Sequence, residues 1–268
     1  MKRRFTDMMG RVVEIPFPPK RIVSVVPSQT ELLHDLGLED EVVGITKFCV
    51  HPESWFRSKT RVGGTKQLHL DKIRALQPDL IIANKEENTQ QQIEELAREF
   101  PVWVSDIHTI VDALEMIAHV GKLVGKEDAA FHLGREIELG FYGFRKADRP
   151  VRTAYFIWYK PWMTVGGDTF ISHMVEAMDF ENVFKARARY PEISLEELKE
   201  ADPELVLLSS EPFPFKEQHI AEIKEVLPNA DVLLVDGEMF SWYGSRMRLA
   251  TPYMKELQKK ILPGQRED

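Results

Sequence analysis

The sequence predicts an α/β protein of two doubly wound lobes with parallel sheets, joined by a single long backbone helix. Strand-like and helix-like segments alternate on short connections, which is typical of parallel sheets covered by helices. In addition, Leu70–Ile82 (LDKIRALQPDLII) and Leu195–Leu207 (LEELKEADPELVL) repeat each other. Each has an acid after the leading Leu, a Pro seven residues after that acid, a second acid and an apolar run. This repeat predicts two similar units.

The first half opens with a predicted hairpin at Thr6–Ile15, with Gly10 at its turn. A buried strand at Arg21–Val26 follows, and then a helix that ends at Gly37. Ser28 is the expected N-cap of that helix, with Glu31 at the capping-box position. Further strands are expected at Val42–Thr46, Leu80–Ala83 and Val102–Val104, and helices at Leu70–Leu76 and Thr89–Glu99.

The middle of the chain contains no strand pattern. Thr109–Val124 is predicted to be helical, and Glu127–Lys146 is predicted to form one uninterrupted helix, about 30 Å long at 1.5 Å per residue. We therefore expect an N-terminal lobe over 1–108, a helical segment over 109–149 and a C-terminal lobe over 150–268. A rigid helical connector predicts little hinge motion between the lobes.

Alternation resumes in the second half. The expected strands are Arg152–Ile157, Leu205–Leu208 and Val232–Val235, with Asp179–Val183 either a strand or a turn. The expected helices are Phe170–Met178, Leu195–Ala201, Gln218–Glu225 and Thr251–Ile261.

The bulk composition narrows the function. The chain has 268 residues and a formal net charge of −8, which argues against nucleic acid as a partner because phosphate binding needs a basic face. The single cysteine, Cys49, excludes an internal disulfide and multi-cysteine metal sites. Cys49 is either a reactive thiolate or a small buried residue at a strand end. The first 20 residues lack the apolar core of a signal peptide, so the chain is cytoplasmic or its export signal lies outside it.

Several phrases carry a resemblance to a known family. They are RIVSVVPSQTELLHDLGLEDEVVGIT, LHLDKIRALQPDLIIAN, the long helix and the second-half ISLEELKEADPELVLLSS. Together they resemble the substrate-binding proteins of bacterial ABC importers for vitamin B12, iron–siderophores and haem. The vitamin B12-binding branch is the most similar, through PSQTELL and KARARYPEISLEEL. The resemblance covers Thr6 to Ile261 and implies two lobes with the ligand bound in a cleft between them.

The resemblance implies one permease-docking acid on each lobe. The matching residues are Asp71 and Glu196, which the internal repeat also pairs. Exposed carboxylates that meet arginines form charge-assisted, orienting hydrogen bonds. The alternative is that each acid only stabilises the first turn of its helix through the helix dipole.

The resemblance also implies that loops after the strands bind the ligand, as in open α/β sheets generally. These loops are rich in aromatic residues, whose faces suit large planar ligands. The candidate ligand-binding residues are Phe48, Thr65, Lys66, Asn84, Trp158, Trp162, Tyr190, Phe240, Trp242 and Arg246.

The chain departs from the B12 binders at three aromatic positions. Gly63–Lys66 and Asn84 stand where those proteins carry tryptophans, and Tyr190 stands where a second-lobe tryptophan is expected. Nearby lysines suit an anionic ligand such as a ferric siderophore or a propionate-bearing tetrapyrrole. His51 and His69 lie on loops expected to face the cleft, where each is either a metal ligand or an ordinary polar residue.

An enzyme is the main alternative. The sequence has no nucleophile elbow, phosphate-binding loop or dinucleotide fingerprint, although a cytoplasmic tetrapyrrole- or metal-handling protein or enzyme on this scaffold stays open. The prediction is a non-catalytic, monomeric solute-binding protein without a cofactor of its own. Its ligand is cobalamin, a ferric siderophore or haem, its partner is an ABC permease, and its location is extracytoplasmic.

Overall fold

Two sheet-containing units make up this protein in its computed structural model, which describes residues 1–262. The contacts between residues assign each segment to one unit. Unit 1 comprises 1–107, 111–138 and 242–246, and unit 2 comprises 108–110, 139–241 and, among the described residues, 247–262. Within residues 1–262 the chain therefore passes between the units five times, after residues 107, 110, 138, 241 and 246, where the sequence predicted a single connection.

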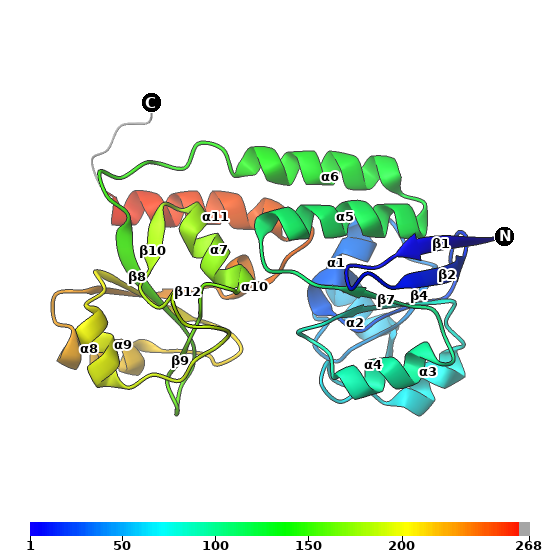
Figure 1. Cartoon of the computed structure of the whole chain (residues 1–268), viewed down its shortest axis with the longest axis horizontal. Helices are drawn as coiled ribbons and strands as arrows, with labels where there is room; N and C mark the ends of the chain where they lie inside the picture. The colour runs from blue at the N-terminus through cyan, green and yellow to red at the C-terminus, as the bar shows by residue number, and fades with distance from the viewer. Residues whose placement is uncertain (263–268) are drawn as a thin grey trace. The chain divides into compact units, whose positions relative to one another are not determined.

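Unit 1 contains a five-stranded parallel sheet of order β5-β4-β3-β6-β7 (Figure 1). Its strands are β3 (Ile22–Ser24), β4 (Val42–Ile45), β5 (Thr60–Arg61), β6 (Leu80–Asn84) and β7 (Val102–Ser105). Its helices are α1 (Pro27–Asp35), α2 (Glu53–Ser58), α3 (Leu70–Leu76), α4 (Gln90–Ala97), α5 (Ile110–Val124) and most of α6 (Glu127–Gly140). An antiparallel hairpin of β1 (Lys2–Thr6) and β2 (Val12–Pro16) precedes the sheet, as predicted.

Helices cover both faces of this sheet. Val102 and Val104 of β7 join a cluster with Ile73 of α3 and Leu96 of α4 on one face. Trp103, between them, points the other way, and its ring lies 6.2 Å from that of a histidine of α5. All five residues of β6 are buried. The uninterrupted apolar runs in the sequence therefore reflect strands that are covered on both sides.

Unit 2 has a parallel sheet of order β10-β8-β11-β12, with one short antiparallel strand, β9, beside β8. The strands are β8 (Val151–Trp158), β9 (Met163–Thr164), β10 (Phe180–Asn182), β11 (Leu205–Ser209) and β12 (Asp231–Val235). The helices are α7 (Phe170–Ala177), α8 (Leu195–Ala201), α9 (Glu217–Val226), α10 (Glu238–Ser241) and α11 (Met247–Ile261). The two sheets share the order of four strands. β3 lies between β4 and the pair β6 and β7, and β8 lies between β10 and the pair β11 and β12.

The internal repeat is reproduced in the backbone. α3 ends at Gln77 with φ 46° and ψ 59°, and α8 ends at Asp202 with φ 41° and ψ 60°. A left-handed residue commonly closes a helix, but it is usually glycine, and here neither copy uses one. Pro78 and Pro203 follow directly and cannot continue the helix. The same unusual turn is therefore built twice.

A matching arginine closes each of these turns. Arg21, before β3, donates from Nε and Nη2 to the Leu76 carbonyl at 2.9 and 2.7 Å. Arg152, in β8, donates from Nη2 to the Ala201 carbonyl at the equivalent place. Carbonyls at a helix C-terminus lack partners within the helix, and a guanidinium satisfies them and complements the helix dipole. The two units thus share a tertiary contact as well as a sequence phrase.

The helix predicted at Glu127–Lys146 is shorter than expected, because α6 ends at Gly140. A Cβ at Gly140 would lie 2.5 Å from the Thr251 hydroxyl oxygen, so this glycine allows close packing on α11. Gly143 then has φ +81°, which ordinary residues rarely adopt. The apolar periodicity of the sequence did not reveal this end.

The predicted cap at Ser28 is wrong. α1 begins one residue earlier, at Pro27, and Val26 occupies the N-cap position without a side-chain cap. Proline suits the first helical position because its missing N–H would have no helical partner there. Ser28 therefore lies within the helix and is buried. The short elements α2, β5, β9 and α10 were not predicted.

Candidate ligand-binding and docking sites

Two asparagines connect the loops at the carboxyl end of the unit 1 sheet. Asn88 donates from Nδ2 to the carbonyls of Val25 and Thr65 at 3.0 and 3.1 Å, and its Oδ1 accepts the N–H of Asn84 at 2.9 Å. Asn84 accepts the N–H groups of the two residues after Lys85 at 2.8 and 2.9 Å. Both side chains are buried. Asn84, a candidate ligand contact, therefore positions the loops, and Asn88 was not singled out from the sequence.

A buried group of hydroxyls surrounds Cys49. Its sulfur lies 3.1 Å from Thr30 Oγ1 and 3.2 Å from Thr46 Oγ1, and Thr30 Oγ1 also bonds Ser24 Oγ at 2.8 Å. Cys49 is fully buried, and burial is the main cause that raises the pKa of its thiol. A raised thiol pKa disfavours the reactive thiolate. Of the two interpretations, the structure supports the buried structural residue.

Phe48 and two lysines form the exposed part of this edge. The Phe48 side chain is 50% exposed, and Lys47 Nζ lies 5.0 Å from its ring centre. A Cβ on Gly64 would approach the Phe48 ring to 3.1 Å, so glycine gives the ring room. Lys66 is exposed and donates to the Glu86 carbonyl, whereas Thr65 is largely buried. Phe48, Lys47 and Lys66 thus combine an aromatic face with two cations.

Trp242 and Arg246 belong to unit 1, although they follow the strands of unit 2 in the sequence. Arg246 donates to Glu31 through Nε at 2.8 Å and Nη2 at 2.6 Å, and it is 7% exposed. Its guanidinium carbon lies 4.9 Å from the centre of the Trp242 ring, and the centre of the His51 ring lies 5.4 Å from that of Trp242. Because Glu31 neutralises Arg246, this candidate cation has a structural partner already.

The aromatic candidates of unit 2 divide into two groups. Trp158, at the end of β8, is 40% exposed, and Tyr190 is partly exposed. Trp162 stacks on Phe215 with ring centres 5.7 Å apart and belongs to the core, and Phe240 is fully buried. The structure therefore leaves Trp158 and Tyr190 as the accessible aromatic candidates of this unit.

The two candidate docking acids occupy equivalent helical positions. Asp71 is in the first turn of α3, and its side chain is 99% exposed, with Arg74 Nη1 at 3.2 Å from its Oδ1. Glu196 is in the first turn of α8 and is exposed. A capping box of Ser194 and Glu197 fixes the start of α8, with hydrogen bonds of 3.1 and 2.9 Å. Both acids are presented on short, well-anchored helices.

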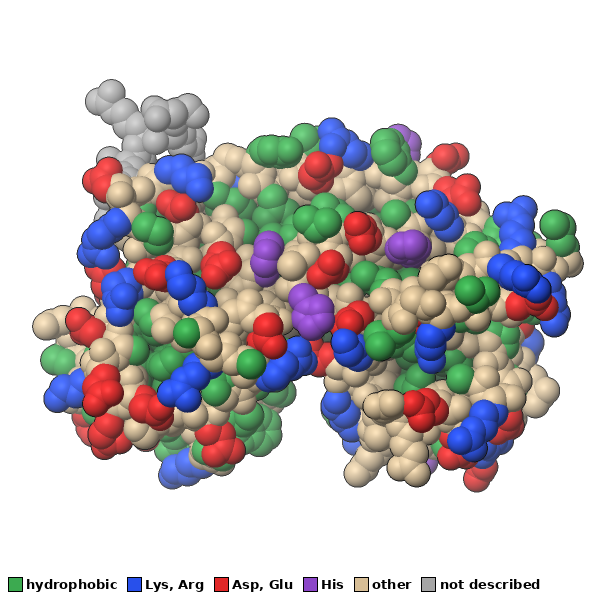
Figure 2. Space-filling view, viewed as in Figure 1, with side chains coloured by type: hydrophobic (Ala, Val, Ile, Leu, Met, Phe, Trp, Pro, Cys, Tyr) green, Lys and Arg blue, Asp and Glu red, His purple; other side chains and the backbone are tan. Residues whose placement is uncertain are grey.

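The surface gives no sign of one dominant charge. On the face shown in Figure 2, acidic and basic side chains are interspersed over each unit. Within residues 1–262 no group of three or more His, Cys, Asp or Glu side chains is placed to hold a metal ion, and this includes His51 and His69. In the same part of the chain, no helix combines the length and apolarity needed to cross a bilayer.

Comparison with known proteins identifies the family. Residues 22–232 match the model of the periplasmic binding protein family. The chain belongs to this family. It is the solute-binding component of an ABC-type importer, so its partners are a small-molecule ligand and the transporter, and it works outside the cytoplasm.

Individual relatives agree with this assignment. The vitamin B12-binding protein of Vibrio campbellii is 27% identical over 197 residues, which cover 72% of this chain and 71% of the relative. The vitamin B12-binding protein of Yersinia pestis is 28% identical over 195 residues, which cover 71% and 69%.

Solved structures confirm the predicted two-lobe fold class. The vitamin B12-binding protein BtuF of Vibrio cholerae matches with a TM-score of 0.79 at 22% identity, over 93% of this chain and 100% of that chain. A haem-binding protein from Pseudomonas aeruginosa matches at 0.77 with 18% identity, over 92% and 94%. The molybdate-binding protein MolA of Haemophilus influenzae matches at 0.79 with 18% identity, over 97% and 91%. At these identities the structures inform the fold alone.

Proposed function

We propose that this periplasmic binding protein binds a large ligand of the corrinoid, ferric siderophore or haem type. The observation that carries the proposal is the exposure of Phe48, which follows β4, and of Trp158, the last residue of β8, at 50% and 40%. Large aromatic side chains left this exposed at the carboxyl ends of parallel strands are suited to ligand contact. Lys47, beside the Phe48 ring, and the exposed Lys66 of the same unit supply positive charge.

The relatives supply the ligand class. Vitamin B12-binding and haem-binding proteins are among the chains that this one resembles. Phe48, Lys66, Trp158 and Tyr190 are the residues that we propose for ligand contact, and Thr65 directly precedes Lys66 in the chain. Asn84 and the buried aromatic residues Trp162 and Phe240 influence ligand binding indirectly, because they shape the loops and the core.

We further propose that Asp71 and Glu196 dock the protein onto arginines of the permease. Both are exposed, and both stand in the first turn of the repeated helix. The equivalent placement suits a partner with two similar subunits. The protein acts as a monomer without catalysis and does not bind nucleic acid.

Ligand binding is tested by thermal unfolding with cobalamin, haem and a ferric siderophore. A ligand at a hundred times its dissociation constant stabilises the native state by about 2.7 kcal/mol, which is readily measured. A shift with one of the three supports the proposal, and no shift with any of them rejects the ligand class.

Docking is tested by uptake in cells that express the cognate permease. Asp71→Arg with Glu196→Arg is expected to abolish uptake and leave ligand affinity unchanged. Glu200→Arg, an exposed charge reversal on the same α8 helix, is the matched control and is expected to transport normally. If the double variant transports normally, or if its ligand affinity falls, the assignment is wrong.

A further inference from the structure

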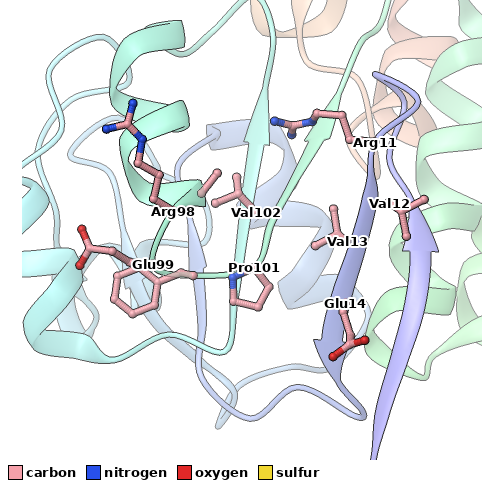
Figure 3. Close-up of a pocket in the computed structure, with 10 residues that line it drawn as sticks. Arg11, Val12, Val13, Glu14, Arg98, Glu99, Pro101 and Val102 are labelled. Atoms are coloured by element: carbon pink, nitrogen blue, oxygen red, sulfur yellow. The ribbon is translucent and has the colours of Figure 1, made fainter.

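A groove in unit 1 separates two strand edges that belong to different sheets. β2 of the hairpin forms one wall, and the end of α4 with the start of β7 forms the other (Figure 3). Its volume is about 380 Å³. The lining residues used in the argument are Arg11, Val12, Glu14, Arg98, Glu99 and Val102.

β7 is the edge strand of the five-stranded sheet, so one side of it pairs with no other strand of that sheet. The carbonyls of Pro101 and Ser105 accept hydrogen bonds across to β6, at 2.9 Å each. Since the backbone groups of alternate residues in a parallel edge strand face opposite sides, the N–H and C=O groups of Val102 and Val104 point away from β6, whereas their side chains lie in the core. Met8 N–H donates to the Val104 carbonyl at 3.1 Å, which closes one end. Among residues 1–262, no hydrogen bond joins Val102 to the hairpin.

β2 presents the facing edge. The bonds Asp7 N–H to Arg11 carbonyl and Phe17 N–H to Met1 carbonyl, both 2.9 Å, fix the odd-numbered residues of β2 as those paired with β1. Val12 and Glu14 therefore direct their N–H and C=O groups away from β1. The Val12 side chain is also 68% exposed. Val104 N–H also donates to Asp7 Oδ2 at 3.4 Å, so Val102 is the β7 residue whose outward backbone groups make no hydrogen bond to the hairpin. The groove is thus lined by Val102 on one wall and by Val12 and Glu14 on the other, and these backbone groups are available to an extended chain.

The charges along the groove indicate what kind of chain would fit. Three charged lining residues have ion-pair partners: Arg11 with Asp7 at 2.7 Å, Glu14 with Lys2 at 3.3 Å, and Glu99 with Arg74 at 2.7 Å. Arg98 is exposed and forms no ion pair within residues 1–262. The uncompensated charge is therefore positive, and it favours an acidic side chain on the bound segment.

We propose that this groove binds a short extended segment of a partner protein by β-strand addition, with an acidic side chain of the segment at Arg98. In this binding mode backbone hydrogen bonds supply affinity and side-chain contacts supply selectivity. A strand residue occupies roughly 3.3 Å along the chain, 4.8 Å between strands and 10 Å between layers, or about 160 Å³. The groove therefore accommodates two to three residues. The site is independent of the importer ligand.

The test uses the whole protein, labelled with ¹⁵N, and the blocked peptide acetyl-Thr-Val-Glu-Val-Thr-amide. Amide resonances of Val12, Glu14 and Val102 are expected to shift on titration and to exchange with solvent at least fivefold more slowly. A peptide N-methylated at both valines loses donors along one edge and is expected to bind at least tenfold more weakly. No shift at millimolar peptide, or equal binding of the N-methylated peptide, would overturn the proposal.

Two pairs of protein variants sharpen the test. Val12→Pro removes an N–H that makes no bond to β1, and it is expected to weaken binding at least tenfold, whereas Val12→Thr keeps the N–H and stays within twofold. Arg98→Glu is expected to weaken binding at least tenfold, whereas Lys260→Glu on α11 makes the same charge change without effect. Equal affinities within either pair contradict the proposal. If Val12→Pro does not fold, the peptide pair still decides it.

Discussion

Arg246 donates two hydrogen bonds to Glu31 across 215 residues of sequence, at 2.8 and 2.6 Å, and both side chains are largely buried. This ion pair attaches the segment 242–246 to α1, the helix that follows β3 in unit 1. Trp242 and His51 pack beside it. The pair therefore connects a late part of the chain to the edge of the sheet where the candidate ligand residues lie.

Removing one member of this pair is expected to be costly. Glu31→Leu leaves the Arg246 charge buried without its partner and should lower the free energy of unfolding by about 3–5 kcal/mol. The double variant Glu31→Leu with Arg246→Met should recover most of the loss, since it removes both charges. Urea unfolding of the single and double variants measures the difference.

The exposed pair Arg149–Glu204 is the matched control. It has the same bidentate form, with both bonds at 2.6 Å, but its side chains are 67% and 41% exposed. Because solvent screens exposed pairs, Arg149→Met should change stability little. If Glu31→Leu and Arg149→Met lower the free energy of unfolding equally, burial of the Glu31–Arg246 pair does not explain its cost.

Asn88 is expected to hold the binding loops in place. Asn88→Ala removes three hydrogen bonds and leaves two buried carbonyls and one N–H without partners. Unfolding free energy should fall by about 2–4 kcal/mol. Thr89→Ala, at the next residue, removes one exposed bond to the Lys66 carbonyl and should cost much less. Similar losses in both variants would contradict the bridging role.

Cys49 should make stability depend on alkaline pH. Its folded pKa is raised above the ordinary thiol value of 9.0, mainly by burial. The native state therefore keeps the proton that the unfolded state loses, so this contribution is complete below pH 9 and is lost as pH rises above it. Unfolding free energy measured between pH 8 and 10 should fall, and Cys49→Ala should flatten the slope. An unchanged slope in Cys49→Ala would assign it to another group.

Two aspartates with positive φ should respond oppositely to glycine. Asp202 has φ 41° and no side-chain hydrogen bond in residues 1–262, so Asp202→Gly should relieve strain and stabilise by about 0.5–1 kcal/mol. Asp179 has φ 60°, but its carboxylate accepts the Ala147 N–H at 3.0 Å and pairs with Lys146 at 3.1 Å. Asp179→Gly should therefore destabilise. Thermal unfolding of both variants checks the opposite signs.

The sequence predicted the regular elements well, because buried parallel strands and repeated helices leave local patterns. α3 and α8 begin and end where the sequence placed them. Local patterns also predicted the equivalence of Asp71 and Glu196, since the repeat has no gaps. The end of α6 was not predictable, because Gly140 is required by a contact with Thr251 that no local pattern records.

The site was predicted less completely. Aromatic content drew attention to the loops after the strands, but it did not distinguish exposed Trp158 from Trp162, which stacks in the core. That difference depends on which neighbours each ring meets. The partner of Arg246 was also hidden, since nothing in the sequence links it to Glu31. The sequence therefore offered Arg246 as a positively charged ligand contact, whereas in the structure its charge is neutralised by Glu31.

Calorimetric titration of Phe48→Ala and Trp158→Ala with cobalamin, haem and a ferric siderophore tests the central claim most directly. Phe131→Ala is the control, because Phe131 is 64% exposed on α6 and away from the strand ends. We expect the unchanged protein and the control to bind one of the three ligands alike, and each of the other two variants to bind it at least tenfold more weakly. Equal affinity in all four proteins, or no binding by the unchanged protein, would contradict the account.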